Sequence, residues 1–195
     1  MEHAITNFHS ESLKIIRDII RNSSLMRLKT HAACEDFDII DADVKDAKIY
    51  APWMSLILVS GKAVRVTFKA HYMNKDAQYL AARVYGSKVD EVKKEQADDF
   101  IKEFCNLTAG LIKKSLEDAT LSVGISLPLV TRGFDEIFFP VEGRKNTYMD
   151  AWELNYAEAS ILCSALIEVF DDSVLDKVRP LELEDSDDDG EIDFL

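Results

Sequence analysis

The chain has 195 residues, enough for one domain with a hydrophobic core, and its 47% hydrophobic content with few glycines and prolines is typical of a globular protein. The formal net charge is -13, and no basic stripe of the kind that contacts phosphate backbones is present, which argues against nucleic-acid binding. The sequence has neither a long uninterrupted apolar run nor a basic and then apolar start, so we expect no membrane span, no signal peptide and a cytoplasmic location.

The first half of the chain predicts one helix, two strands and a second helix. Over residues 5–28, apolar side chains recur at helical spacing with charged residues between them. A polar stretch over 34–46 follows, and then two strands over 48–60 and 62–70, the second with clear alternation of apolar and polar residues. A helix is expected over 74–86, where it ends at a glycine.

The second half predicts the longest helix, over 90–117, and then strands over 121–130, 134–141, 147–156 and 159–170. The last of these strands has a competing interpretation, because Ala, Glu and Leu are frequent over 157–170 and favour a helix. Strands joined by short turns pair antiparallel. We therefore expect an α+β fold, with a mainly antiparallel sheet and long amphipathic helices packed on it.

The last fourteen residues differ in composition from the rest of the chain. Residues 182–195 contain eight acids and no base, and without them 28 acids face 23 bases, a net charge of about -5. We therefore expect one domain over 1–181 and an acidic tail over 182–195. Residues 185–190 match the first half of a calcium-binding loop, but the match stops there, and we interpret the segment as a solvated tail.

The three cysteines are Cys34, Cys105 and Cys163, widely separated along the chain and odd in number. Neither they nor the four histidines have the spacing of a metal or redox site. We expect reduced and mostly buried thiols.

Residues 98–117 of the longest predicted helix have two distinct faces. Its apolar stripe, which we expect to contact the core, consists of Phe100, Ile101, Phe104, Leu107, Leu111 and Ile112. Glu103, Asn106 and Gly110 lie roughly opposite, within about 60° of one another. An acid and an amide three residues apart usually form only a solvated face. A glycine inside a helix is less ordinary, because it costs about 1 kcal/mol relative to alanine, and it suggests close approach by another backbone, from this protein or from a partner.

These residues resemble a known family. Residues 103–110 resemble the Glu-x-x-Asn-x-x-x-Gly signature of the CheC/CheX/FliY chemotaxis phosphatases, and residues 126–133 resemble the family's later Ser-x-Pro-x-x-x-x-Gly strand. Upstream, residues 64–68 and 76–86 are similar to the strand and small helix that precede the signature. A single copy of the signature matches the CheX-like branch, which implies a homodimer.

The resemblance implies hydrolysis of the aspartyl-phosphate on a response-regulator receiver domain, which would be CheY-like. Asn106 would hold the attacking water, and Glu103 would pair with a lysine beside the phosphoaspartate. The protein would need no cofactor or metal of its own, since the Mg²⁺ would belong to the partner. Lys113 and Lys114 would steer an acidic partner toward the helix.

The sequence departs from the family pattern at two positions, and its segments 21–46 and 171–195 have no clear counterpart in the family. Thr108 stands where an apolar residue is more usual, and Lys69-Ala70 lacks a glycine that often follows the strand. A non-catalytic module that binds a receiver, or a dimeric scaffold of the same fold with an acidic tail for recruitment, therefore stays open beside the enzyme.

Overall fold

The structure is a computed structural model that describes residues 11–42, 51–133 and 146–181. In this part of the chain the α-helices are α1 Glu11–His31, α2 Asn74–Tyr85 and α3 Lys94–Asp118. The strands are β1 Asp38–Asp41, β2 Trp53–Gly61, β3 Val64–Tyr72, β4 Val123–Ile125, β5 Leu129–Arg132, β6 Thr147–Tyr156 and β7 Ala159–Val169. Two short 3-10 helices, η2 Val89–Glu91 and η4 Asp172–Lys177, complete the described elements.

The seven strands form one antiparallel sheet. Its order is β1-β6-β7-β3-β2-β4, and β5 also pairs with β2, next to the residues that pair with β4. The long central strands β3 and β7 pair from Val64–Val169 to Tyr72–Ile161. This mainly antiparallel sheet with helices packed on it confirms the predicted α+β class.

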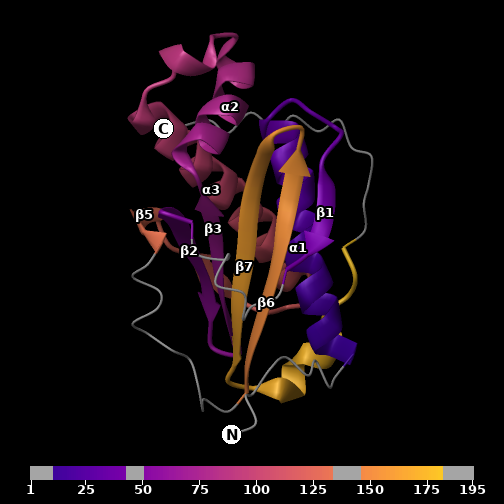
Figure 1. Ribbon diagram of the computed structural model, residues 1–195. Coiled ribbons are helices and arrows are strands. Elements are labelled where there is room, and N and C mark those ends of the chain that lie inside the picture. The colour runs from indigo at the N-terminus through magenta and orange to yellow at the C-terminus, as the bar shows by residue number, and fades with distance from the viewer. Residues whose placement is uncertain (1–10, 43–50, 134–145, 182–195) are drawn as a thin grey trace, which may run out of the picture.

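The helices α1 and α3 contact each other and lie behind the sheet in the view of Figure 1, while α2 packs at one end against α3 and β7. The core lies between the sheet and these helices. At its centre, the Phe68 ring of β3 contacts the Phe104 ring of α3, with ring centroids 5.8 Å apart, and the Trp152 ring of β6, with centroids 6.2 Å apart. All three side chains are fully buried, so α3 is fixed firmly to the sheet.

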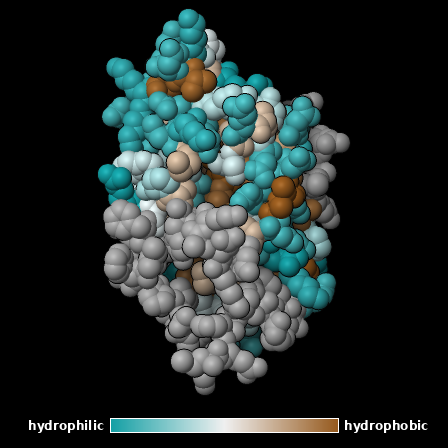
Figure 2. All heavy atoms as spheres, in the orientation of Figure 1, coloured by the Kyte–Doolittle hydropathy of each residue, from teal (hydrophilic) through white to brown (hydrophobic). Residues whose placement is uncertain are grey.

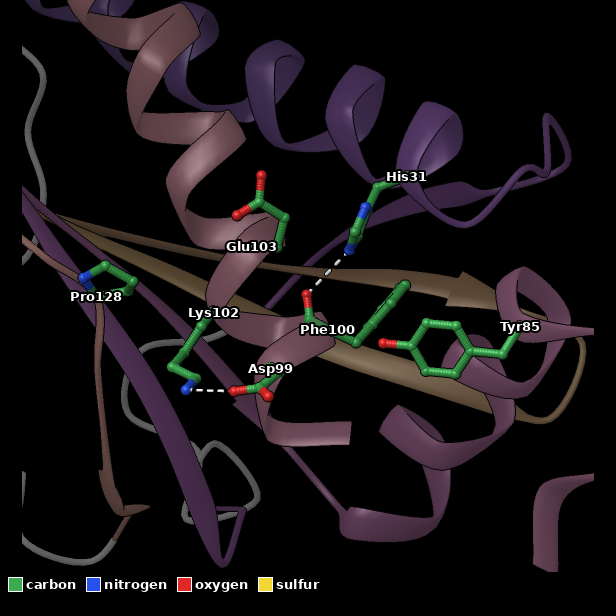
Figure 3. Close-up of a pocket in the computed structure, with 7 residues that line it drawn as sticks. All are labelled: His31, Tyr85, Asp99, Phe100, Lys102, Glu103 and Pro128. Atoms are coloured by element: carbon green, nitrogen blue, oxygen red, sulfur yellow. Dashed lines mark hydrogen bonds and ion pairs between the residues drawn. The ribbon is translucent and has the colours of Figure 1, made fainter. Parts of the chain in front are cut away.

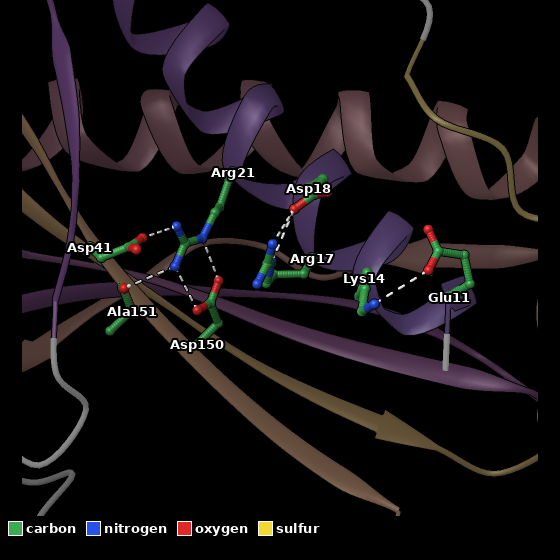
Figure 4. A network of polar contacts seen from close by, with 8 residues as sticks. All are labelled: Glu11, Lys14, Arg17, Asp18, Arg21, Asp41, Asp150 and Ala151. Atoms are coloured by element: carbon green, nitrogen blue, oxygen red, sulfur yellow. Dashed lines mark hydrogen bonds and ion pairs between the residues drawn. The ribbon is translucent and has the colours of Figure 1, made fainter. Parts of the chain in front are cut away.

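A half-buried arginine attaches α1 to the strands β1 and β6 (Figure 4). The Arg21 guanidinium donates to both carboxylate oxygens of Asp150 at 2.6 and 2.7 Å and also to Asp41, and it lies over the Trp152 ring. Burial acts against the charge of Arg21, but the hydrogen bonds to the two carboxylates outweigh it and raise its pKa. The hydrogen bond that Arg21 donates to Asp41 lowers the pKa of the Asp41 carboxyl group.

Most predicted elements are present, with shifted ends. α2 ends before Gly86, whose φ of 61° is the left-handed conformation that a helix end favours, and the N–H of Ser87 donates to the Ala82 carbonyl. β7 is a strand along its length, because it is paired on both sides by β3 and β6, so the helical interpretation of 157–170 is wrong. Sheet pairing here overrides helix propensity.

Three expectations need correction. The predicted strand over 121–130 is two short strands, β4 and β5, separated around Pro128, which has no N–H to donate to a sheet ladder. The polar stretch over 34–46 contains the edge strand β1, whose four residues are all exposed and so show no alternation. The helix predicted to start at residue 90 begins at Lys94, after η2. The predicted strand over 134–141 and the tail over 182–195 lie outside the described residues, as does the start of the first helix.

The hydrophilic character of the visible surface agrees with the globular composition of the chain. Figure 2 shows the described residues on one face as mostly hydrophilic, with small separate hydrophobic patches. Over the described ranges, none of the helices combines the length and the apolar character that a membrane span requires.

Candidate functional site

The helix α3 buries the apolar stripe that the sequence predicted. Phe100, Ile101, Phe104, Leu111 and Ile112 are buried in it, and Leu107 is half-buried. Thr108 belongs to the buried side as well, where its hydroxyl donates to the Phe104 carbonyl at 2.8 Å. This hydrogen bond satisfies the one polar group that interrupts the stripe, so the departure at residue 108 does not disturb the packing of α3.

The opposite side of α3 carries an exposed row made of Glu103, Asn106 and Gly110. We call these three residues the exposed row. Glu103 and Asn106 lie about 4.5 Å apart along the helix axis and about 60° apart around it. Among the described residues, neither side chain has a hydrogen-bond or ion-pair partner. A carboxylate and an amide are therefore presented together to solvent on a helix that the core holds in place.

Gly110 has no structural explanation within the described fold. A Cβ atom at this position would meet no atom within 4 Å, and the backbone does not adopt a positive φ. The sequence suggested close approach by a backbone from this protein or from a partner. No backbone of the described residues makes this approach, because among them the space above Gly110 is open.

Next to Glu103 lies an open hollow of about 440 Å³ between four parts of the fold (Figure 3). Its walls come from the end of α1, the end of α2, the first half of α3 and the segment before β5. They consist of His31, Tyr85, Asp99, Phe100, Lys102, Glu103 and Pro128. Of these residues, only Glu103 was predicted as a functional residue. Asp99, Phe100 and Lys102 are its neighbours on α3, whereas His31, Tyr85 and Pro128 are distant in the chain and are brought there by the packing of the elements.

His31 closes one side of this hollow. Its ring stacks on Phe100, with centroids 4.3 Å apart, and its Nε2 lies 3.1 Å from the Phe100 carbonyl oxygen. Burial lowers the pKa of His31, even though the nearby Glu103 carboxylate acts in the opposite direction. Asp99 pairs with Lys102, three residues further along α3. Among the described residues, the Glu103 carboxylate is thus left without a cationic partner at neutral pH.

The segment 126–133 runs beside α3 in a fixed conformation. The Ser126 hydroxyl accepts the Leu58 N–H at 3.0 Å, and the Ser126 N–H donates to the Leu58 carbonyl at 2.9 Å. At the other end, a Cβ on Gly133 would lie only 1.9 Å from the Ala51 carbonyl oxygen, so this position requires glycine. Both landmarks of the segment therefore have a structural role, unlike Gly110.

The two lysines further along α3 differ in their surroundings. Lys113 is paired with Glu117 at 3.7 Å, whereas Lys114 is exposed and has no carboxylate partner among the described residues.

The cysteines are free and buried, as the sequence predicted. Burial raises the pKa of Cys105 to about 12 and also raises that of Cys163, so both thiols are protonated at neutral pH. Within the described ranges, no group of His, Cys, Asp and Glu side chains has the geometry to hold a metal ion.

Comparisons with known proteins bear on the fold alone. No family model and no curated protein sequence matches the chain. Among solved structures, CheX from Vibrio vulnificus aligns with a TM-score of 0.61 at 14% identity, over 78% of this chain and 99% of that one. CheX from Borrelia burgdorferi, in a complex with CheY, BeF3 and Mg²⁺, aligns with a TM-score of 0.61 at 13% identity, over 78% and 97%. A chemotactic CheC-like protein from Shewanella oneidensis aligns with a TM-score of 0.62 at 15% identity, over 79% and 98%.

The sheet and its helices thus define an α+β protein with an acid and an amide displayed on one exposed helix. Its fold is that of the CheX and CheC-like chemotaxis proteins. This likeness confirms, at the level of the fold, the family resemblance seen in residues 103–110 and 126–133.

Proposed function

We propose that this protein is a phosphatase for the aspartyl-phosphate of a CheY-like receiver domain. The observation that carries the proposal is the exposed row on α3, where Glu103 and Asn106 stand free of internal partners beside the unobstructed Gly110. Side chains that serve the fold are normally buried or hydrogen-bonded. Here the two polar groups point away from a rigid core, which suits insertion into another protein's site.

In the proposed reaction, water attacks the phosphorus in line with the partner's aspartate oxygen. The new bond joins the water oxygen to phosphorus, the bond from phosphorus to the carboxylate oxygen breaks, and the water proton leaves with the inorganic phosphate. The Asn106 amide both accepts and donates hydrogen bonds, so it can hold this water in position without acting as a base. Placement of the nucleophile is the main task of a protein in phosphoryl transfer.

Glu103 would dock the partner by pairing with a lysine beside the phosphoaspartate. The surroundings support this role, because Asp99 is already paired with Lys102 and the lowered pKa of His31 keeps that ring neutral. The Glu103 carboxylate is therefore available to a cation from outside.

The likeness to a CheX structure solved with CheY, BeF3 and Mg²⁺ supports a receiver as partner. In this proposal the Mg²⁺ is bound by the receiver, and this chain contributes no metal ligand. The single copy of the signature supports a homodimer, as in the CheX-like branch, and a receiver substrate places the protein in the cytoplasm.

The test is release of inorganic phosphate from a receiver domain phosphorylated with acetyl phosphate. The native protein should accelerate release over the receiver's own rate, and Asn106→Ala should lose about 10²-fold or more of that acceleration. Glu117→Ala is the matched control, because it removes an exposed acid from the same helix about 17 Å from Asn106, and it should leave the rate unchanged. If the native protein binds the receiver without accelerating release, it is a binding module and the enzyme proposal fails.

Glu103→Ala tests the docking role separately. Loss of the carboxylate should weaken receiver binding about tenfold to a hundredfold, measured as a rise in KM, and leave kcat at saturation less affected.

A further inference from the structure

A second hollow lies at the other end of α3, next to the segment that follows η4. Its volume is about 360 Å³, and its charged lining consists of Lys114, Asp118, Lys177 and Arg179. Leu111, Ala119 and Leu181 contribute apolar surface to it. We call this hollow the basic groove. Three cations against one acid give the groove a positive charge. This is opposite in sign to the net charge of about -5 on residues 1–181.

The cations of the basic groove form no ion pairs within the described residues. Lys114, Lys177 and Arg179 are exposed, and none of them has a carboxylate partner in the described ranges. Arg179 is nevertheless held in place, because its guanidinium donates to the Asp176 carbonyl at 2.6 Å and to the Val178 carbonyl at 3.1 Å. A positioned but unpaired guanidinium is suited to receive a carboxylate from elsewhere.

The residue that precedes the acidic tail, Leu181, lines this groove. Leu181 is half-buried, packs against the core and lines the groove, and the next residue is Glu182. The fourteen residues over 182–195 carry eight acids and no base, and an extended chain of that length spans about 46 Å. Every acid of the tail is therefore within reach of the groove, and the tether gives the tail a high effective concentration there.

We propose that the basic groove binds the chain's own acidic tail, residues 182–195. The charges are complementary, the two parts are covalently adjacent, and the groove's cations have no carboxylate partner in the described ranges. Individual exposed ion pairs are weak and sensitive to salt, so the contact is reversible. The exposed Lys114 of the groove lies four residues beyond Gly110 on α3, about 6 Å along the helix and about 40° around it, so a bound tail brings negative charge next to the Gly110 end of the exposed row. The binding itself does not depend on the proposed phosphatase function.

The experiment uses the full chain with a nitroxide spin label on a cysteine introduced by Gly190→Cys. The native cysteines are buried and weakly reactive, so the label attaches to the tail, and the substitution removes no acid. Relaxation enhancement of backbone amides then reports where the tail lies. We expect the enhancement to concentrate on residues 111–119 of α3 and to be lost in 1 M salt, where the Debye length is about 3 Å.

Charge variants decide whether the groove is responsible. Lys114→Glu, Lys177→Glu and Arg179→Glu together should abolish the enhancement on α3, while the matched change in charge at Lys62, Lys75 and Lys88, three exposed lysines elsewhere, should leave it unchanged. Replacing Asp185, Asp187, Asp188, Asp189, Glu191 and Asp193 by lysine in the groove variant leaves two acids and six bases in the tail, and this reversal of its charge should restore the enhancement. A uniform enhancement, a maximum on another surface, or equal loss in both triple variants would show that the tail does not bind the groove.

Discussion

Gly110→Ala separates what the free protein needs at this position from what a partner would need. The added methyl group meets no atom of the described residues within 4 Å and the backbone conformation suits alanine, so nothing in this part of the chain opposes the change. Alanine is favoured over glycine inside a helix by about 1 kcal/mol, and for a chain of this size such a gain raises Tm by about 2–4 °C. We expect this gain in thermal or urea unfolding.

The same methyl group should weaken the interaction with the receiver, because it projects one turn beyond Asn106 into the space that a partner backbone would occupy. A rise in KM for the phosphorylated receiver, together with the gain in stability, is the expected result. Gly133→Ala is the contrasting control: its Cβ would lie 1.9 Å from the Ala51 carbonyl oxygen, so it should destabilise the fold. A stabilised Gly110→Ala protein with unchanged receiver kinetics would refute the idea that Gly110 makes room for a partner.

Three further predictions concern stability and reactivity. Arg21→Gln leaves the largely buried Asp150 carboxylate without its cation and should destabilise the protein by about 3 kcal/mol, measured by urea unfolding. Because burial lowers the pKa of His31, the unfolded chain takes up this proton first as the pH falls below about 6.5; stability should therefore rise with pH up to that value, and His31→Gln should flatten the profile. Cys105 and Cys163 should resist a thiol reagent in the native protein and react on unfolding; rapid native labelling of either would contradict their burial.

The sequence predicts the long periodic elements well, because their burial writes a regular pattern into the chain. α3 buries one continuous face, β3 alternates buried and partly buried residues along most of its length, and α2 ends where Gly86 supplies the left-handed cap. The edge strand β1 was missed since all its residues are exposed, and an exposed strand has no alternation to detect. The division of 121–130 into two strands follows from Pro128, a local signal that the sequence contained.

The candidate site was only partly predictable. Glu103 and Asn106 share a helix face, so their spacing alone indicates that they lie together. His31 and Tyr85 reach the hollow from α1 and α2, and their arrival depends on how three helices pack. The sequence also does not reveal that Gly110 has open space above it among the described residues, whereas Gly133 lies against the Ala51 carbonyl oxygen. That difference comes from tertiary structure.

The most direct test of the central claim compares native protein and Asn106→Ala on a phosphorylated receiver at saturating concentration, with receiver binding measured in parallel. If Asn106 holds the attacking water, the variant should bind the receiver as the native protein does but lose about 10²-fold or more of the accelerated phosphate release. Equal rates of release in the two proteins would contradict the account.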